Sequence, residues 1–134
     1  MSDLPANLIH FEGSLNDLNE KINAHDGLTV VKFGTTTCPP CRRLNQVLPG
    51  IARENETVQF IAIELDTQPE FKSAFSITSV PNLFYFKGKD AEGHPQQVAN
   101  IVGLKVPQIK EKIDELKWYI FFLSRHTYIR IKRI

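Results

Sequence analysis

The sequence contains little of several residue types, and each scarcity excludes a class of protein. It has only two cysteines, one methionine and one tryptophan, and its net charge is +1. A chain of 134 residues with 42% hydrophobic residues can bury a core without disulfides, and two cysteines three positions apart close too short a loop to stabilise it. The near-neutral charge argues against general nucleic-acid binding. The N-terminus has neither a basic start nor a continuous apolar segment, so it does not resemble a secretory signal. We therefore expect a reducing, cytoplasmic location.

Metal-ligand spacing is also missing. The four histidines, His10, His25, His94 and His126, are scattered along the chain. A closed zinc site needs four ligands, so the cysteines alone do not make one. We therefore expect no metal site.

The two cysteines form the motif Cys38-Pro39-Pro40-Cys41, directly after the apolar run Leu28 to Phe33. Side chains three positions apart share one face of a helix, so the two sulfurs can come within bonding distance. A strand followed by a proline turn and a helix places Cys38 at the helix N-terminus, where free N–H groups and the macrodipole favour an anion. The motif predicts a reversible dithiol in which Cys38 is the easier thiol to ionise.

Hydrophobic periodicity predicts an α/β fold with a mixed sheet. We expect strands at 8–11, 28–33, 58–65, 83–86 and 97–102, and helices after Ser14, after Cys41, at 69–75 and at 106–117. Pro49-Gly50 predicts a bend or break in the second helix. No repeat or linker interrupts residues 1–117, so we assign these to one domain and 118–134 to a C-terminal extension.

The chain resembles the thioredoxin family over about residues 7–117. Three separated features carry the resemblance: the Cys-Pro-Pro-Cys turn after a strand, Val80-Pro81, and Val102-Gly103. The resemblance implies a thioredoxin fold, with a central mixed sheet of four or five strands flanked by helices on both faces. It also implies a cis Pro81 that faces the cysteines, with the Val80 backbone offered to an extended substrate segment. Pro39 and Gly103 complete the expected substrate contacts.

The resemblance further implies a protein-disulfide reductase that serves electron transport and cell redox homeostasis. Cys38 is the expected nucleophile and Cys41 the resolving cysteine. The resemblance implies that no cofactor is bound, and that the redox-active disulfide Cys38-Cys41 receives reducing equivalents from NADPH through thioredoxin reductase. The expected partners are that reductase and disulfide-containing proteins of peroxiredoxin or reductase type, with no nucleic acid.

Neighbouring residues are expected to tune the cysteines. Pro39 and Pro40 have no N–H, which leaves the Cys41 amide as the local donor to the Cys38 sulfur. Arg42 and Arg43 add positive charge, although a solvated surface role is the simpler interpretation.

The chain departs from the family at three positions. Gly34 and Thr37 stand where thioredoxins carry tryptophans, and the threonines at 35–37 are expected to make local backbone bonds. Lys32 stands where thioredoxins hold a buried aspartate. An ammonium favours thiolates but cannot accept the Cys41 proton as a carboxylate does. Lys32 is expected either to pair with Glu64 on the neighbouring strand or to snorkel to solvent.

The C-terminal extension differs in composition from the rest. Residues 118–134 carry a net charge of +4, against −3 for residues 1–117, and begin with the apolar run 118–123, too short to cross a bilayer. Because Ile120 and Leu123 extend the spacing of the last helix, the simpler expectation is a continued helix with a disordered basic end. The other is a contact with a membrane surface or a partner.

Two other functions stay open. Loss of the family tryptophans and aspartate is compatible with a non-enzymatic adapter on the same fold, although retention of both cysteines argues against it. A weak oxidase or isomerase is also compatible, because redox poise depends on thiolate stability.

Overall fold

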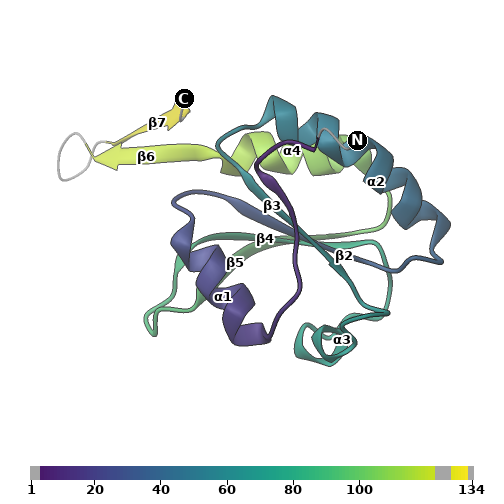
Figure 1. The fold of residues 1–134 in the computed structure, drawn as a ribbon. Helices are drawn as coiled ribbons and strands as arrows, with labels where there is room; N and C mark the ends of the chain where they lie inside the picture. Colours follow the sequence, from purple (N-terminus) through teal and green to yellow (C-terminus); the bar gives the residue numbers. More distant parts are fainter. Residues whose placement is uncertain (1–3, 123–127, 133–134) are drawn as a thin grey trace.

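The computed structural model describes residues 4–122 and 128–132, and its centre is a five-stranded mixed sheet of order β1-β3-β2-β4-β5 (Figure 1). The strands are β1 (Leu8–His10), β2 (Thr29–Gly34), β3 (Gln59–Glu64), β4 (Asn82–Lys89) and β5 (Pro95–Val102). Strand β3 pairs in parallel with β1 and β2, whereas β4 is antiparallel to β2 and β5. The predicted mixed sheet is confirmed, in its five-stranded form.

Four helices cover the two faces of this sheet (Figure 1). They are α1 (Leu15–Ala24), α2 (Pro39–Glu54), α3 (Glu70–Ala74) and α4 (Val106–Leu116). One core cluster joins α2 and α4 to the sheet, and a second joins α1 and α3 to its other face. Apolar side chains spaced three and four apart on the helices fill both clusters, as their periodicity predicts. The expectation of helices on both faces is confirmed.

Helix α1 begins where the sequence predicts. The Ser14 hydroxyl accepts the Asp17 N–H, and the Asp17 carboxylate accepts the Ser14 N–H, which completes a capping box. Helix α2, in contrast, continues without a break through Pro49. Of the expected bend or break, the break is therefore wrong: Leu44 and Ile51, on either side of the proline, are both buried in the same cluster, which favours a continuous helix.

The continued helix expected at the C-terminus is wrong. Helix α4 ends at Leu116, and β6 (Trp118–Phe122) pairs antiparallel with β7 (Tyr128–Lys132) in a separate hairpin (Figure 1). Aromatic residues and Ile120 in this segment favour a strand. The Lys87 ammonium donates to the carbonyls of Leu116 and Trp118 at the root of the hairpin. Leu123 lies outside the described residues, and the domain boundary at 117 stays a prediction.

Candidate active site

The Cys-Pro-Pro-Cys motif joins β2 to α2. Cys38 is the N-cap of the helix, Pro39 opens its first turn, and Cys38 and Cys41 are joined by a disulfide with a Cα–Cα distance of 5.2 Å. The Cys41 N–H donates to Cys38 Sγ at 3.2 Å, as predicted from the lack of an N–H at Pro39 and Pro40. Cys38 is half-buried and Cys41 is fully buried. An incoming partner therefore reaches the Cys38 sulfur first.

Two further loops face the disulfide. The Val80-Pro81 peptide bond is cis, as the resemblance implied, and the Val80 carbonyl oxygen lies 3.8 Å from Cys38 Sγ. The Gly103 N–H donates to the Pro81 carbonyl at 2.8 Å, and Gly103 has a φ of +100°, a conformation that favours glycine. Segments around positions 38, 81 and 103 thus meet at one end of the sheet.

A cavity of about 310 Å³ adjoins Val80. Its lining includes the buried side chains of Leu65 and Ile77, together with the exposed Asp66 and Lys72. An opening of this size at a sheet end suits one or two apolar side chains of a bound chain.

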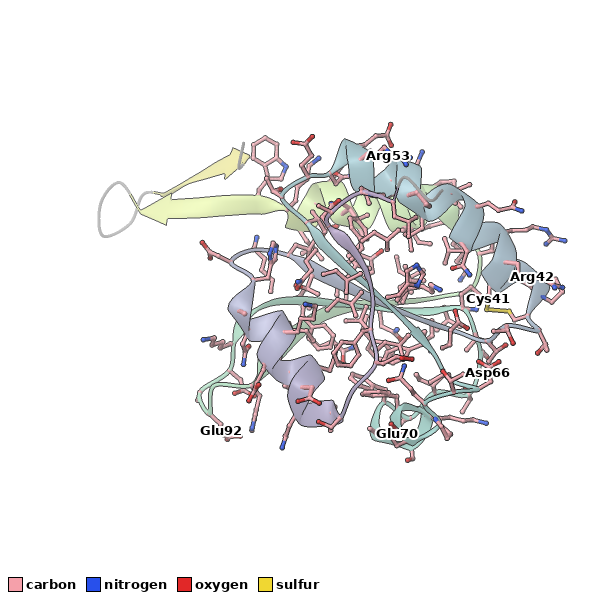
Figure 2. All side chains as sticks on the ribbon, in the orientation of Figure 1. Cys41, Arg42, Arg53, Asp66, Glu70 and Glu92 are labelled. Carbon is pink, nitrogen blue, oxygen red and sulfur yellow. A yellow bond between two sulfur atoms is a disulfide. The ribbon has the colours of Figure 1, made fainter. Side chains whose placement is uncertain are left out.

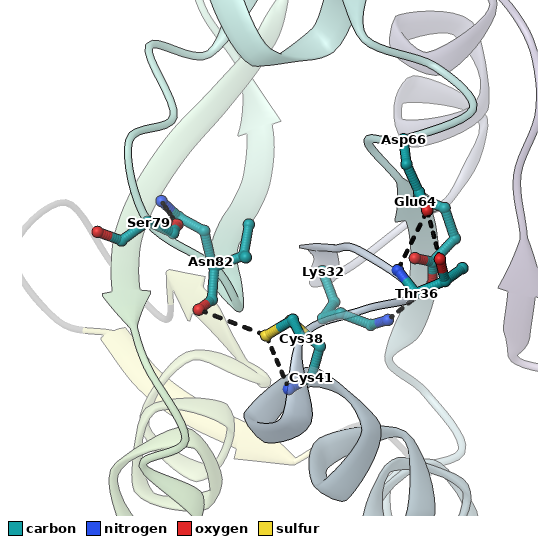
Figure 3. Close-up of a disulfide and its surroundings, with 9 residues drawn as sticks. Lys32, Thr36, Cys38, Cys41, Glu64, Asp66, Ser79 and Asn82 are labelled. Atoms are coloured by element: carbon teal, nitrogen blue, oxygen red, sulfur yellow. Dashed lines mark hydrogen bonds and ion pairs between the residues drawn. A yellow bond between two sulfur atoms is a disulfide. The ribbon is translucent and has the colours of Figure 1, made fainter.

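The β2–α2 loop is tied to the loop after β3. Both the backbone N–H and the hydroxyl of Thr36 donate to Asp66 Oδ2 (Figure 3). The hydroxyl bond lowers the pKa of the Asp66 carboxyl, with the backbone donors adding to the effect. The local backbone bonding expected for the threonines holds at Thr35, whose carbonyl accepts the Cys38 N–H, but is wrong for Thr36. Sequence reasoning missed Asp66, which is 30 residues away in the chain.

Lys32 is buried behind the disulfide, with only 1% of its surface exposed. Its Nζ lies 3.8 Å from Glu64 Oε1, so the chain adopts the expected ion pair and the snorkelling alternative is wrong. Burial lowers the pKa of Lys32 by removing water from the ammonium, and the nearby Glu64 carboxylate opposes this effect. Arg42 and Arg43, by contrast, are exposed on α2, in keeping with a solvated surface role.

One group of potential metal ligands was not singled out from the sequence. Asp90, Glu92 and His94, in the β4–β5 turn, bring ligand atoms within 4.8 Å of one another. The Asp90 carboxylate accepts the N–H groups of Glu92 and His94 at 2.9 Å each, which accounts for the cluster as a turn. All three residues are exposed and far along the chain from the disulfide.

The sequence model of the thioredoxin family matches residues 11–115, which include every strand of the five-stranded sheet except β1. The chain belongs to the thioredoxin family. A solved structure of Trichomonas vaginalis thioredoxin matches with a TM-score of 0.77 and 34% identity, covering 83% of this chain and 98% of that one. The hairpin β6–β7 lies outside the family match.

Curated relatives fall into two groups. Thioredoxin from Echinococcus granulosus is 33% identical over 89 residues, which is 66% of this chain and 78% of that protein. Glutaredoxin 3 from Danio rerio is 30% identical over 104 residues, or 77% of this chain. This chain spans only 30% of the length of that glutaredoxin, so the match is to one part of a longer protein.

The geometry of this thioredoxin-family site suits thiol-disulfide exchange. It holds one accessible sulfur at a helix N-terminus and a second, buried sulfur bonded to it, opposite a backbone carbonyl. Thiolate attack on a disulfide sulfur needs this access and a nearby resolving thiol. Within residues 4–122 and 128–132, no helix is long and apolar enough to cross a membrane.

Proposed function

We propose that this thioredoxin-family chain reduces disulfides of protein substrates through reversible oxidation of Cys38 and Cys41. The single observation that carries the proposal is the bonded pair of sulfurs, one accessible and one buried, opposite the cis Val80-Pro81 bond. Membership of the family supports the same reaction class.

The reaction proceeds in two exchanges. The Cys38 thiolate attacks one sulfur of the substrate disulfide, forms a mixed disulfide and displaces the second substrate sulfur as a thiolate. The Cys41 thiolate then attacks Cys38 Sγ, which breaks the bond to the substrate and releases its first sulfur. The substrate gains two electrons, and the enzyme ends with the Cys38-Cys41 disulfide.

The substrate segment binds as an extended strand along Val80. A carbonyl of Val80 next to Cys38 Sγ is well placed to accept an N–H of such a segment, and the mixed disulfide fixes its register. One apolar side chain of the segment enters the cavity beside Val80. Pro39, Pro81 and Gly103 are proposed to complete the contacts with the substrate segment.

We also propose that thioredoxin reductase, with NADPH as the electron source, returns the disulfide to the dithiol. Substrates are disulfide-containing proteins of peroxiredoxin or reductase type. A reducing compartment such as the cytoplasm suits this cycle, because it keeps the working dithiol reduced.

An insulin-reduction assay with thioredoxin reductase and NADPH tests the function. The wild type and the control Arg42→Gln are expected to turn over, whereas Cys38→Ser is inactive. Cys41→Ser is expected to accumulate the mixed disulfide with substrate, because no thiol resolves it. A wild type that reduces insulin neither with the reductase nor with dithiothreitol as the reductant makes the chain an adapter. Net oxidation of a reduced substrate would instead assign it to the oxidases.

The hairpin is proposed as a second contact surface, for a membrane surface or a protein partner. An isolated two-stranded sheet is marginally stable alone, and residues 118–134 combine aromatic residues with a net charge of +4. Deletion of residues 118–134 is expected to leave insulin reduction unchanged. The same deletion should abolish sedimentation with phosphatidylserine vesicles; if the full chain does not sediment with them, the partner is a protein.

A further inference from the structure

The buried amine of Lys32 has hydrogen-bond donors that its ion pair with Glu64 does not use. Its Nζ is 3.8 Å from Glu64 Oε1, beyond hydrogen-bond distance, and within the described part of the chain it has no hydrogen-bond partner. An ammonium has three donors, and leaving them unmet in a buried site is costly. We therefore expect the charge or the donors of Lys32 to interact with a second group nearby.

The resolving sulfur lies near this amine, on the same side of Gly34. A methyl group placed on Gly34 would lie 3.3 Å from Cys41 Sγ, closer than such contacts normally are, and 3.7 Å from Lys32 Nζ. The sulfur and the amine therefore border the same narrow space beside Gly34 and are at most 7.0 Å apart, the sum of these two distances. Figure 3 shows Lys32 on the strand beside the disulfide, with its amine directed toward Glu64.

Other charges around this space are farther away or turned outward. Glu64 reaches Lys32 from β3, with 28% of its side chain exposed, and none of its atoms is among the three nearest to the space beside Gly34. Asp66 is exposed and held by Thr36. On α2, Arg42 and Arg43 point away into solvent. Of the charged groups, Lys32 thus comes nearest to the space beside Gly34 that Cys41 Sγ also borders, and its charge is positive.

We propose that the Lys32 ammonium, held in place by Glu64, stabilises the Cys41 thiolate and so sets the rate at which Cys41 resolves the mixed disulfide. This inference rests on the proposed reductase function. The Cys41 S–H bond breaks and its proton passes to solvent. The electron pair on sulfur then forms the bond to Cys38, and the bond from Cys38 to the substrate breaks with its electron pair on the substrate sulfur. In this step Lys32 acts only through its charge, and it neither gives nor takes a proton.

The first test measures ionisation without any turnover. The ¹³Cβ shift of Cys41 in the reduced protein is followed against pH in the wild type, Lys32→Met and Lys32→Arg. Lys32→Met is expected to raise the pKa of Cys41 by about one unit, the low end of the range for an opposite charge within about 4–6 Å. Lys32→Arg keeps the charge and should keep the pKa low. Lys112→Met, on an exposed ion pair of α4, is the matched control without effect.

The second test measures resolution. Cys38 is converted to its mixed disulfide with thionitrobenzoate, and release of the coloured thiol reports attack by Cys41. A thiolate of higher pKa is a better nucleophile, so the loss in rate below the pKa is about threefold per unit rather than tenfold. Above its own pKa, Lys32→Met should match or exceed the wild type. A purely structural effect would slow release at every pH.

Two results would overturn the inference. One is a wild-type Cys41 whose pKa is no lower than that of Cys41 in Lys32→Gln. This variant keeps a side chain of similar length without the charge, and it serves where Lys32→Met does not fold. The other is Lys32→Met with an unchanged Cys41 pKa and release profile. Because neither test uses insulin or a reductase, failure here leaves the proposed function standing, and failure of the insulin assay leaves this test intact.

Discussion

Asn7 fastens the start of the chain to the end of the helix that carries Cys38. Its side-chain Nδ2 donates to the carbonyls of Ala52, Asn55 and Val58 at 3.0, 3.0 and 2.9 Å. Asn7→Ala removes two N–H donors and leaves three carbonyls to find other partners. With a net value of about 0.5–1.5 kcal/mol for each hydrogen bond, we expect unfolding to require about 1–3 kcal/mol less free energy.

Thermal unfolding followed by circular dichroism is the assay. For a chain of this length, 1 kcal/mol corresponds to about 3–5 °C in Tm, so the expected fall for Asn7→Ala is about 3–15 °C. Asn23→Ala is the matched control, because its Nδ2 donates to the single carbonyl of Gly93 at an exposed site. That variant should lose at most about 1 kcal/mol.

Asn7→Asp separates the lost donors from the lost volume. A carboxylate is close in size to the amide but cannot donate to carbonyls at neutral pH, so it should be at least as destabilising as alanine. The explanation is refuted if Asn7→Asp is as stable as the wild type, or if Asn7→Ala costs no more than Asn23→Ala. Initial rates of insulin reduction at 25 °C should remain near the wild-type value, since Asn7 does not contact the disulfide.

Three other predictions concern the site and the hairpin. Lys32→Met should be more stable than the wild type at neutral pH. Folding lowers the pKa of Lys32 from 10.5, so keeping its amine charged in the wild type costs free energy of folding. This cost is full below the folded-state pKa and vanishes as the pH rises past 10.5. Urea unfolding at several pH values should show that the difference in unfolding free energy between the variant and the wild type becomes smaller as the pH rises. A difference that does not change with pH would contradict this. Gly103→Ala should destabilise the protein by about 1 kcal/mol or more, because its φ of +100° is strained for alanine. Calorimetry should show a lower Tm, and an unchanged Tm would contradict this. Trp118 fluorescence should change little on reduction of the disulfide, since Trp118 lies in the hairpin; a large change would show that the two are coupled.

Much of the sheet and of the disulfide site could be predicted because local signals decide them. Strands β2 and β3 are short, largely apolar segments rich in Val, Ile and Phe, a length and composition that favour a buried strand. The donor to the Cys38 sulfur follows from the two prolines between the cysteines. Side-chain parity likewise placed Lys32 and Glu64 on one face, although it could not decide between burial and escape to solvent.

The failures depended on contacts between distant residues. The bond of Thr36 to Asp66 joins loops that are 30 residues apart, and no local pattern signals it. The hairpin was missed because Ile120 continues the helical spacing of α4. Pairing with β7 and the bonds from Lys87 to the carbonyls of Leu116 and Trp118 outweigh that spacing.

Strand β4 connects two regions with separate roles. It starts at Asn82, next to the cis proline, and carries Lys87 near its other end, five residues on, about 17 Å away at the rise of an extended chain. Figures 1 and 2 show the hairpin at one end of the molecule and Cys41 at the other. A partner bound to the hairpin would therefore leave the Cys38 sulfur accessible. Binding at the hairpin and electron transfer at the disulfide can then occur at the same time.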